Sequence, residues 1–253
     1  MIRLSAPSAA IAFFVLSGLS SDLRAEEELR VAVASSFAPA AEILAERYHD
    51  ISGARVVLVA GSTGKHYAQI VNGAPFEVFL AADELRPTKL RELGLGISDS
   101  RFTYALGRLV LWSPKEDWFD FGESLLRQVR FRRLAIANPR FAPFGLAAKQ
   151  ALESLGIWDS LQGNLVRGEN VGQAFHFVSS RNADLGFISL SQIIDFESAR
   201  LEGSHWIVPE TLYQPIRQQA LLLTETPSAR DFLAFLTSNQ GRAIIEQFGY
   251  GLP

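Results

Sequence analysis

Residues 29–64 read LRVAVASSFAPAAEILAERYHDISGARVVLVAGSTG, and this stretch decides the fold class. It begins and ends with short apolar runs, residues 29–34 and 55–60, which have the length and composition of buried strands. Between the two runs, Pro39 opens a segment whose apolar residues recur at helical spacing, namely Ala41, Leu44, Ala45 and Tyr48. A strand, an amphipathic helix and a second strand in this order predict a parallel βαβ unit.

The same alternation of elements continues along the rest of the chain. Further strands are expected at residues 77–81, 108–112, 134–137, 185–189 and 218–223. Helices are expected at residues 66–71, from 143 to about 155, from 170, and at 228–237 and 240–248. Hydrophobic residues make up 48% of the 253 and charged residues 20%, which is typical of a folded domain. The sequence therefore predicts an α/β protein with buried, largely parallel sheets.

The first 25 residues have the pattern of a secretory signal peptide. Arg3 precedes the apolar run AAIAFFVLSGL at residues 9–19, and a short polar stretch ends at the small residue Ala25. The run is shorter than the roughly 20 residues that a membrane helix needs. We expect residues 1–25 to be removed after Ala25 and the remaining chain to be an exported, soluble protein.

Composition excludes several classes of function. The chain has no cysteine, which rules out disulfides, thiolate metal sites and a cysteine nucleophile. Its formal net charge of −3 argues against nucleic acid as a partner. The four histidines are scattered without metal-ligand spacing, no nucleophile elbow is present, and the GSTGKH sequence at residues 61–66 lacks the spacing of a phosphate loop. We therefore expect a protein that is not an enzyme and carries no cofactor.

Small polar residues and glycines gather where four expected helices begin. The four turns are Ser35-Ser36, Ser62-Thr63-Gly64, Pro143-Phe144-Gly145 and Asn170-Val171-Gly172. A helix N-terminus has unpaired N–H groups and a partial positive charge, so it can hold an anion, and such turns meet at the carboxyl ends of parallel strands. Any single turn is also explained by helix capping. Four turns together raise the anion-site interpretation to equal standing with capping, and the residues alone leave both open.

Six segments, spread in order over nearly all of the chain after residue 25, carry a family resemblance. They read VAVASSFAPAAEILAERY, GSTGKHYAQIVNGAPFEVFLAADE, SRFTYALGRLVLWSP, ANPRFAPFGLAAKQALESLGIWD, ENVGQAFHFVSSRNADLGFISLSQI and GSHWIVPETLYQPIRQQALLL. Together they resemble the periplasmic molybdate-binding proteins of ABC transporters. The motifs specific to that family are Asn72-Gly73-Ala74-Pro75, Ala82-Asp83 and the PFGLA sequence of residues 143–147.

The resemblance implies a two-lobe, venus-flytrap fold in which each lobe is a mostly parallel sheet flanked by helices. Lobe 1 would comprise residues 26–106 and 216–253, and lobe 2 residues 107–215, with hinge crossings near 105–110 and 215–219. A molybdate or tungstate oxyanion would bind between the lobes and pass to a membrane permease. The protein would act as a monomer and bind no nucleic acid.

The resemblance also implies which residues hold the ligand. Side-chain donors would come from Ser35, Ser36, Ser62 and Thr63, with Thr63 at the main position. Backbone amides of Phe144 and Val171 would oppose them. Some members of the family add a tyrosine from a strand of lobe 2, where this chain has Ser189, which is a weaker candidate. The metal would be held as an oxyanion, without direct ligation by side chains.

Two kinds of alternative remain. The first is a binding protein of the same architecture for another ligand, such as sulfate, phosphonate, ferric ion or an organic anion. A ferric site needs converging tyrosine and histidine or carboxylate ligands, and the four turns supply none. The second is an enzyme or a ligand-sensing regulator, which would carry an acid–base pair or a DNA-binding motif. Selection against sulfate would depend on cavity size, and sequence does not separate molybdate from tungstate.

Overall fold

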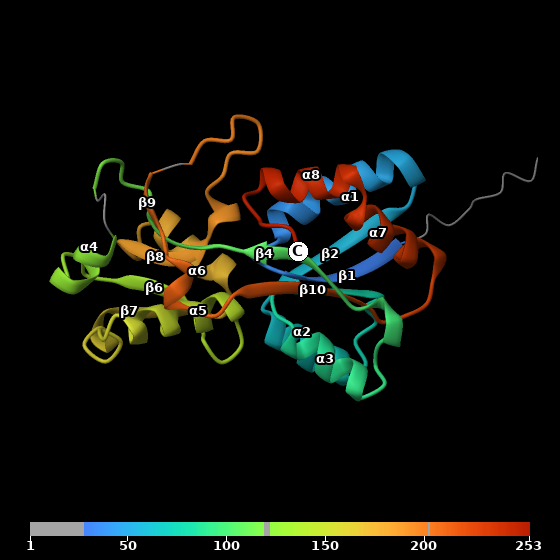
Figure 1. Cartoon of the computed structure of the whole chain (residues 1–253), viewed down its shortest axis with the longest axis horizontal. Helices are drawn as coiled ribbons and strands as arrows, with labels where there is room; N and C mark the ends of the chain where they lie inside the picture. Colours follow the sequence, from blue (N-terminus) through green and yellow to red (C-terminus); the bar gives the residue numbers. More distant parts are fainter. Residues whose placement is uncertain (1–27, 119–121, 202) are drawn as a thin grey trace, which may run out of the picture.

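The computed structural model describes residues 28–118, 122–201 and 203–253, and the expected signal peptide lies outside them. These residues form two lobes side by side along the long axis of the molecule, each built on one sheet with helices packed against it (Figure 1). In the described part of the chain, no helix is both long and apolar enough to cross a membrane.

The sheet of the first lobe has the strand order β2-β1-β3-β10-β4. Its strands are β1 (Glu28–Ala34), β2 (Arg55–Gly61), β3 (Val78–Ala81), β4 (Phe102–Gly107) and β10 (Ile216–Leu222). One face is covered by α1 (Ala38–Ser52), α7 (Pro227–Thr237) and α8 (Asn239–Gln247), and the other by α2 (Thr63–Val71) and α3 (Leu85–Glu92) (Figure 1). Both ends of the described chain therefore contribute to this lobe.

The sheet of the second lobe has the order β7-β6-β8-β5-β9. Its strands are β5 (Leu109–Ser113), β6 (Leu134–Ala137), β7 (Leu165–Gly168), β8 (Leu185–Ser189) and β9 (Ser204–Ile207). Its helices are α4 (Gly122–Gln128), α5 (Pro143–Ser154) and α6 (Val171–Ser179). Short 3-10 turns occur at Ser98–Ser100, Gln162–Asn164, Leu190–Gln192 and Glu210–Leu212. The central strands β5, β6 and β8 are fully buried, which places the core of this lobe around them.

Both sheets are mixed, whereas the sequence predicted mostly parallel ones. In the first lobe β1 pairs in parallel with β2 and β3, but β10 is antiparallel to both β3 and β4. In the second lobe β6 is parallel to β7 and β8, but β5 is antiparallel to β8 and β9. The reason is the route of the chain between the lobes. Strands β5 and β10 start at the cleft, where the parallel strands end, and so run in the opposite direction.

Candidate functional site

A small cavity lies between the lobes, with about 190 Å³ of space not filled by atoms, including its open mouth. It is found where β1, β2 and β3 end and where α2, α5 and α6 begin. Its lining includes six of the residues named from the sequence, Ser35, Ser36, Ser62, Thr63, Phe144 and Val171. The remaining lining residues are Ala34, Gly61, Ala82, Ala142, Pro143 and Asn170. The structure thus brings all four helix-opening turns of the sequence to one place.

The side of the cavity formed by the first lobe offers hydroxyl groups. Ser36 is buried, and its Oγ has no hydrogen-bond partner in the described structure, so its proton is free to be donated into the cavity. The Thr63 Oγ1 accepts a 3.0 Å hydrogen bond from the Ala82 N–H. That bond fixes the side chain and leaves the Thr63 hydroxyl proton free for a ligand.

Two further serines of this lobe have partners that set their orientation. The Ser62 Oγ caps α2 by accepting a hydrogen bond from the Lys65 N–H at 3.3 Å. The Ser35 Oγ accepts one from the Gly172 N–H of the opposite lobe at 3.2 Å. Both oxygens act as acceptors in these bonds, so each hydroxyl keeps a proton that it can donate.

The side formed by the second lobe offers helix N-termini. Helix α5 begins at Pro143, and its capping residue Ala142 makes no side-chain hydrogen bond to the first turn. First-turn N–H groups, here that of Phe144, have no partner inside a helix. Helix α6 begins at Val171, and Asn170 caps it by accepting a 2.9 Å bond from the Gln173 N–H. The side chains of Phe144 and Val171 are buried in the core of this lobe, so only their backbone N–H groups are available to the cavity.

The cavity contains no formal charge, because every residue in its lining is neutral. The nearby Lys65 ammonium pairs with the Glu169 carboxylate of the opposite lobe, which balances its charge. No group of three or more histidine, aspartate or glutamate side chains suited to a metal occurs in the part of the chain that the structure describes. Neutral donors converging from two lobes fit an oxyanion and do not fit a bare cation.

A cluster of hydroxyls behind Ser36 holds its backbone in place. The Ser36 carbonyl accepts hydrogen bonds from the Tyr250 hydroxyl at 2.6 Å and from Ser191 Oγ at 2.7 Å. Burial raises the pKa of Tyr250, so its hydroxyl stays protonated and remains a donor. Neither partner could be predicted from the sequence, because no local motif marks a tyrosine near the end of the chain as a neighbour of Ser36.

Ser189 does not line the cavity. Its buried hydroxyl lies 2.8 Å from that of Ser191, so Ser189 is part of the cluster behind Ser36. It also caps the 3-10 turn Leu190–Gln192. The residue that the resemblance named as a weaker ligand candidate thus lies in the cluster that supports the site.

His66 is packed inside the first lobe, next to the lining of the cavity. It is buried, with Nε2 3.2 Å from the Val33 carbonyl and Nδ1 3.0 Å from Gln69 Oε1. Burial lowers its pKa, which keeps the ring neutral at pH 7. Its ring fills the space beside Gly61, where an added Cβ would lie 2.7 Å from Nε2. The histidine therefore packs against a residue of the cavity lining and does not itself line the cavity.

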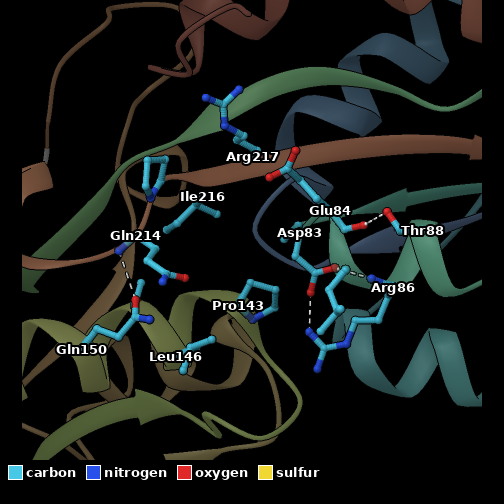
Figure 2. Close-up of a pocket in the computed structure, with 14 residues that line it drawn as sticks. Asp83, Glu84, Arg86, Thr88, Pro143, Leu146, Gln150, Gln214, Ile216 and Arg217 are labelled. Carbon is cyan, nitrogen blue, oxygen red and sulfur yellow. Dashed lines mark hydrogen bonds and ion pairs between the residues drawn. The ribbon is translucent and has the colours of Figure 1, made fainter.

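A larger hollow adjoins the cavity and shares Ala82 and Pro143 with it. It encloses about 930 Å³, including its open mouth. Figure 2 shows that several of its polar groups are paired with one another. Asp83 binds Arg86, and the Gln150 Oε1 accepts a 3.1 Å bond from the Gln214 N–H. These pairs engage Asp83, Arg86 and Gln150 with protein partners.

Comparison with known proteins agrees with this geometry. Residues 29–251 match the family described as bacterial extracellular solute-binding protein. The chain is 42% identical to the molybdate-binding protein ModA of Azotobacter vinelandii over 240 residues, which cover 93% of this chain and 94% of that one. It is 38% identical to the ModA of Rhodobacter capsulatus over 244 residues, covering 95% and 94%.

A solved structure agrees as well. The Azotobacter vinelandii periplasmic molybdate-binding protein superposes with a TM-score of 0.86 at 43% identity, over 89% of this chain and 99% of the other. The two-lobe fold that the sequence resemblance implied is thereby confirmed, as is the interpretation that this is a binding protein and not an enzyme. The chain belongs to the family of bacterial extracellular solute-binding proteins.

Proposed function

We propose that this protein captures molybdate or tungstate between its lobes in the periplasm and delivers it to the permease of an ABC transporter. The observation that carries the proposal is the small interlobe cavity lined by hydroxyls and helix N-termini without any charged side chain. The names of the relatives from Azotobacter vinelandii and Rhodobacter capsulatus, both molybdate-binding proteins, support the choice of ligand.

The chemistry of the donors matches that of the ligand. Molybdate and tungstate are fully deprotonated dianions at neutral pH, so each oxygen is an acceptor. The candidate donors are the hydroxyls of Ser36 and Thr63 and the N–H groups of Phe144 and Val171, with Ser35 and Ser62 beside them. Phosphate monoanion keeps a proton and needs an acceptor in return. Hydrogen bonds to a charged acceptor are about twice as strong as neutral ones, so such a site needs no cation.

Sulfate or a phosphonate remains the second candidate, because sulfate is also a deprotonated dianion. Size distinguishes it from molybdate, since the metal–oxygen bonds are longer than those of sulfur. The test is a thermal-shift panel of molybdate, tungstate, sulfate, phosphate and chromate. Ligand at a hundred times its Kd adds about 2.7 kcal/mol of stability, a rise in Tm of roughly 5–10 °C for a chain of this size. No shift with molybdate or tungstate would refute the assignment, and an equal shift with sulfate would favour the alternative.

The division of the chain and its partners are part of the same proposal. We assign residues 26–106 and 216–253 to lobe 1 and residues 107–215 to lobe 2, which is supported by the division of β1–β4 and β10 from β5–β9 between two sheets. The family supports export through the signal peptide at residues 1–25. We expect a monomer without affinity for nucleic acid, in keeping with the net charge of −3.

A further inference from the structure

The lobes touch each other directly on both sides of the cavity, and a glycine lies at each contact. The Gly64 N–H donates to the Phe141 carbonyl of the second lobe at 2.9 Å. The Gly172 N–H donates to the Ser35 Oγ of the first lobe at 3.2 Å. Gly64 is the second residue of α2 and Gly172 the second residue of α6. In each helix the first residue lines the cavity and the second binds the opposite lobe.

The contact at Gly64 leaves no room for a side chain. An added Cβ would lie 2.8 Å from the Phe141 carbonyl oxygen and 3.0 Å from the Phe141 Cα, both backbone atoms of the other lobe. At Gly172 the nearest atom of the opposite lobe, the Ser35 Cβ, would be 3.3 Å away. The contact at Gly64 is therefore the tighter of the two.

The backbone of Gly64 does not itself require glycine. Its φ lies outside the left-handed region that side chains avoid, and it sits inside the first turn of α2. Within a helix, alanine is the more favourable residue. The close approach of the Phe141 backbone is what excludes a side chain here.

Two further contacts join the lobes beside this one. Lys65, next to Gly64, forms the ion pair with Glu169. Arg86, which Asp83 holds in place (Figure 2), donates from Nη2 to the Arg140 carbonyl at 3.1 Å. These bonds join protein to protein without passing through the cavity, so they fix the distance between the lobes whatever the ligand.

We propose that Gly64 is a positioning residue that sets the width of the closed cleft. Closure stops where its N–H meets the Phe141 carbonyl, and the donors on the two sides then stand at the spacing of one oxyanion. The inference rests on the proposed function. Because the stop is a contact between backbones, the lobes do not close further around an anion smaller than molybdate. Sulfate therefore fails to contact all the donors at once. The selectivity for molybdate over sulfate follows from this limit on closure.

The test compares Gly64→Ala with Gly163→Ala, a control at which a new Cβ meets nothing within 4 Å and φ is ordinary. The proposal places the clash in the closed form alone, so the Tm of ligand-free Gly64→Ala stays equal to or above that of the wild type. The dissociation rate of molybdate rises about ten- to hundredfold, as expected for an overpacked contact. The association rate stays within about twofold, because the first encounter uses the donors of one lobe.

Selectivity and lobe distance give independent readouts. Sulfate already lacks part of the donor set in the wild type, so Gly64→Ala lowers the ratio of molybdate to sulfate affinity about tenfold. The chain has no cysteine. Spin labels on Glu92→Cys in α3 and Glu153→Cys in α5, both exposed, then report the distance between the lobes without background. At saturating molybdate, the labelled protein that keeps Gly64 shows one short distance between the labels. The labelled Gly64→Ala variant also keeps a population with the longer distance of the open form.

The outcomes separate the two proposals. Wild-type rates and a single short distance in Gly64→Ala would overturn the inference. So would a clear loss of ligand-free Tm in that variant, or the same faster release in Gly163→Ala. If the wild type itself binds none of the oxyanions, the proposed function fails. The inference then fails with it, because there is no bound ligand whose size the contact at Gly64 could select.

Discussion

The two lobes meet the same cavity with different chemistry. The first lobe presents side-chain hydroxyls, which are held by bonds such as those from the Ala82 N–H of the same lobe to Thr63 Oγ1 and from the Gly172 N–H of the second lobe to Ser35 Oγ. The second lobe presents backbone N–H groups at the starts of α5 and α6, while the side chains of Phe144 and Val171 point into its core. The proposed site thus depends on the identity of side chains in the first lobe and on the position of helix starts in the second.

Removing one hydroxyl of the first lobe is the change with the largest expected effect. Thr63→Ala and Ser36→Ala each delete a donor to a buried dianion, which is worth about 1.5–3 kcal/mol, or roughly ten- to hundredfold in Kd. Titration calorimetry with molybdate measures the loss. Ser160→Ala, an exposed hydroxyl bonded to the Ile157 carbonyl, is the matched control and keeps the wild-type Kd. Wild-type affinity in both site variants would place the ligand elsewhere.

The second lobe is tested by removing an N–H while keeping the helix. Val171 is the first residue of α6, a position that tolerates proline, and Asn170 before it is extended with φ −141° and ψ 175°, as a residue before proline prefers. Val171→Pro therefore deletes the donor without breaking the helix, and we expect Kd to rise about tenfold or more.

Val171→Ala is the partner of that variant, because it changes the side chain and keeps the N–H. It lowers the free energy of unfolding by about 1–2 kcal/mol through the lost packing, and molybdate affinity stays within about threefold. Urea unfolding and calorimetry on both variants separate the two effects. If alanine weakens binding as much as proline does, the side chain matters and the contrast between the lobes is wrong.

The smallest expected effect is the loss of stability at acid pH that His66 causes in the first lobe. Burial lowers the pKa of His66 below the 6.5 of the unfolded chain. Above pH 6.5 the ring is neutral in both states, and its burial carries no proton-linked penalty. As pH falls from 6.5 through the lowered pKa, the unfolded state takes up the proton first, so stability contributed by this residue is lost.

His66→Gln removes this titration and keeps an amide that can donate to the Val33 carbonyl. Urea unfolding at pH 7 and pH 5 then shows a smaller fall in stability for the variant than for the wild type. An equal fall in both proteins would mean that other groups account for the acid sensitivity.

The sequence predicted those elements whose signal is local. Strands β1, β6 and β8 are short runs of buried apolar residues and were expected within one residue of their bounds. Strands β7 and β9 were missed because they lie at the edges of the sheet, where their half-exposed residues show no clear pattern. Helix α3 was missed because its sequence, LRPTKLRE, is mostly polar and contains a proline in its first turn.

The candidate site divides in the same way. The four turns were visible because a helix start leaves a mark in adjacent residues, and the structure brings these turns to one cavity. The bond from Tyr250 to the Ser36 carbonyl joins residues 214 positions apart, and no local pattern encodes such a contact. Ser189 was named only through the family resemblance, as a weaker candidate, and its hydroxyl instead lies against that of Ser191, which is outside the strand.

Helix α5 lacks a side-chain cap, which gives the proposed ligand a second, structural role. Serine caps α2 and asparagine caps α6, but Ala142 has no side-chain oxygen to offer the first turn of α5. An oxyanion bound there would accept hydrogen bonds from the first turn of α5, as the Ser62 hydroxyl does for α2. The ligand would thus act as the N-cap of α5. Without a ligand those N–H groups have no side-chain cap from Ala142. Hydrogen exchange of the first-turn amides of α5 is thus expected to slow when the ligand binds, and it reports whether the site is occupied.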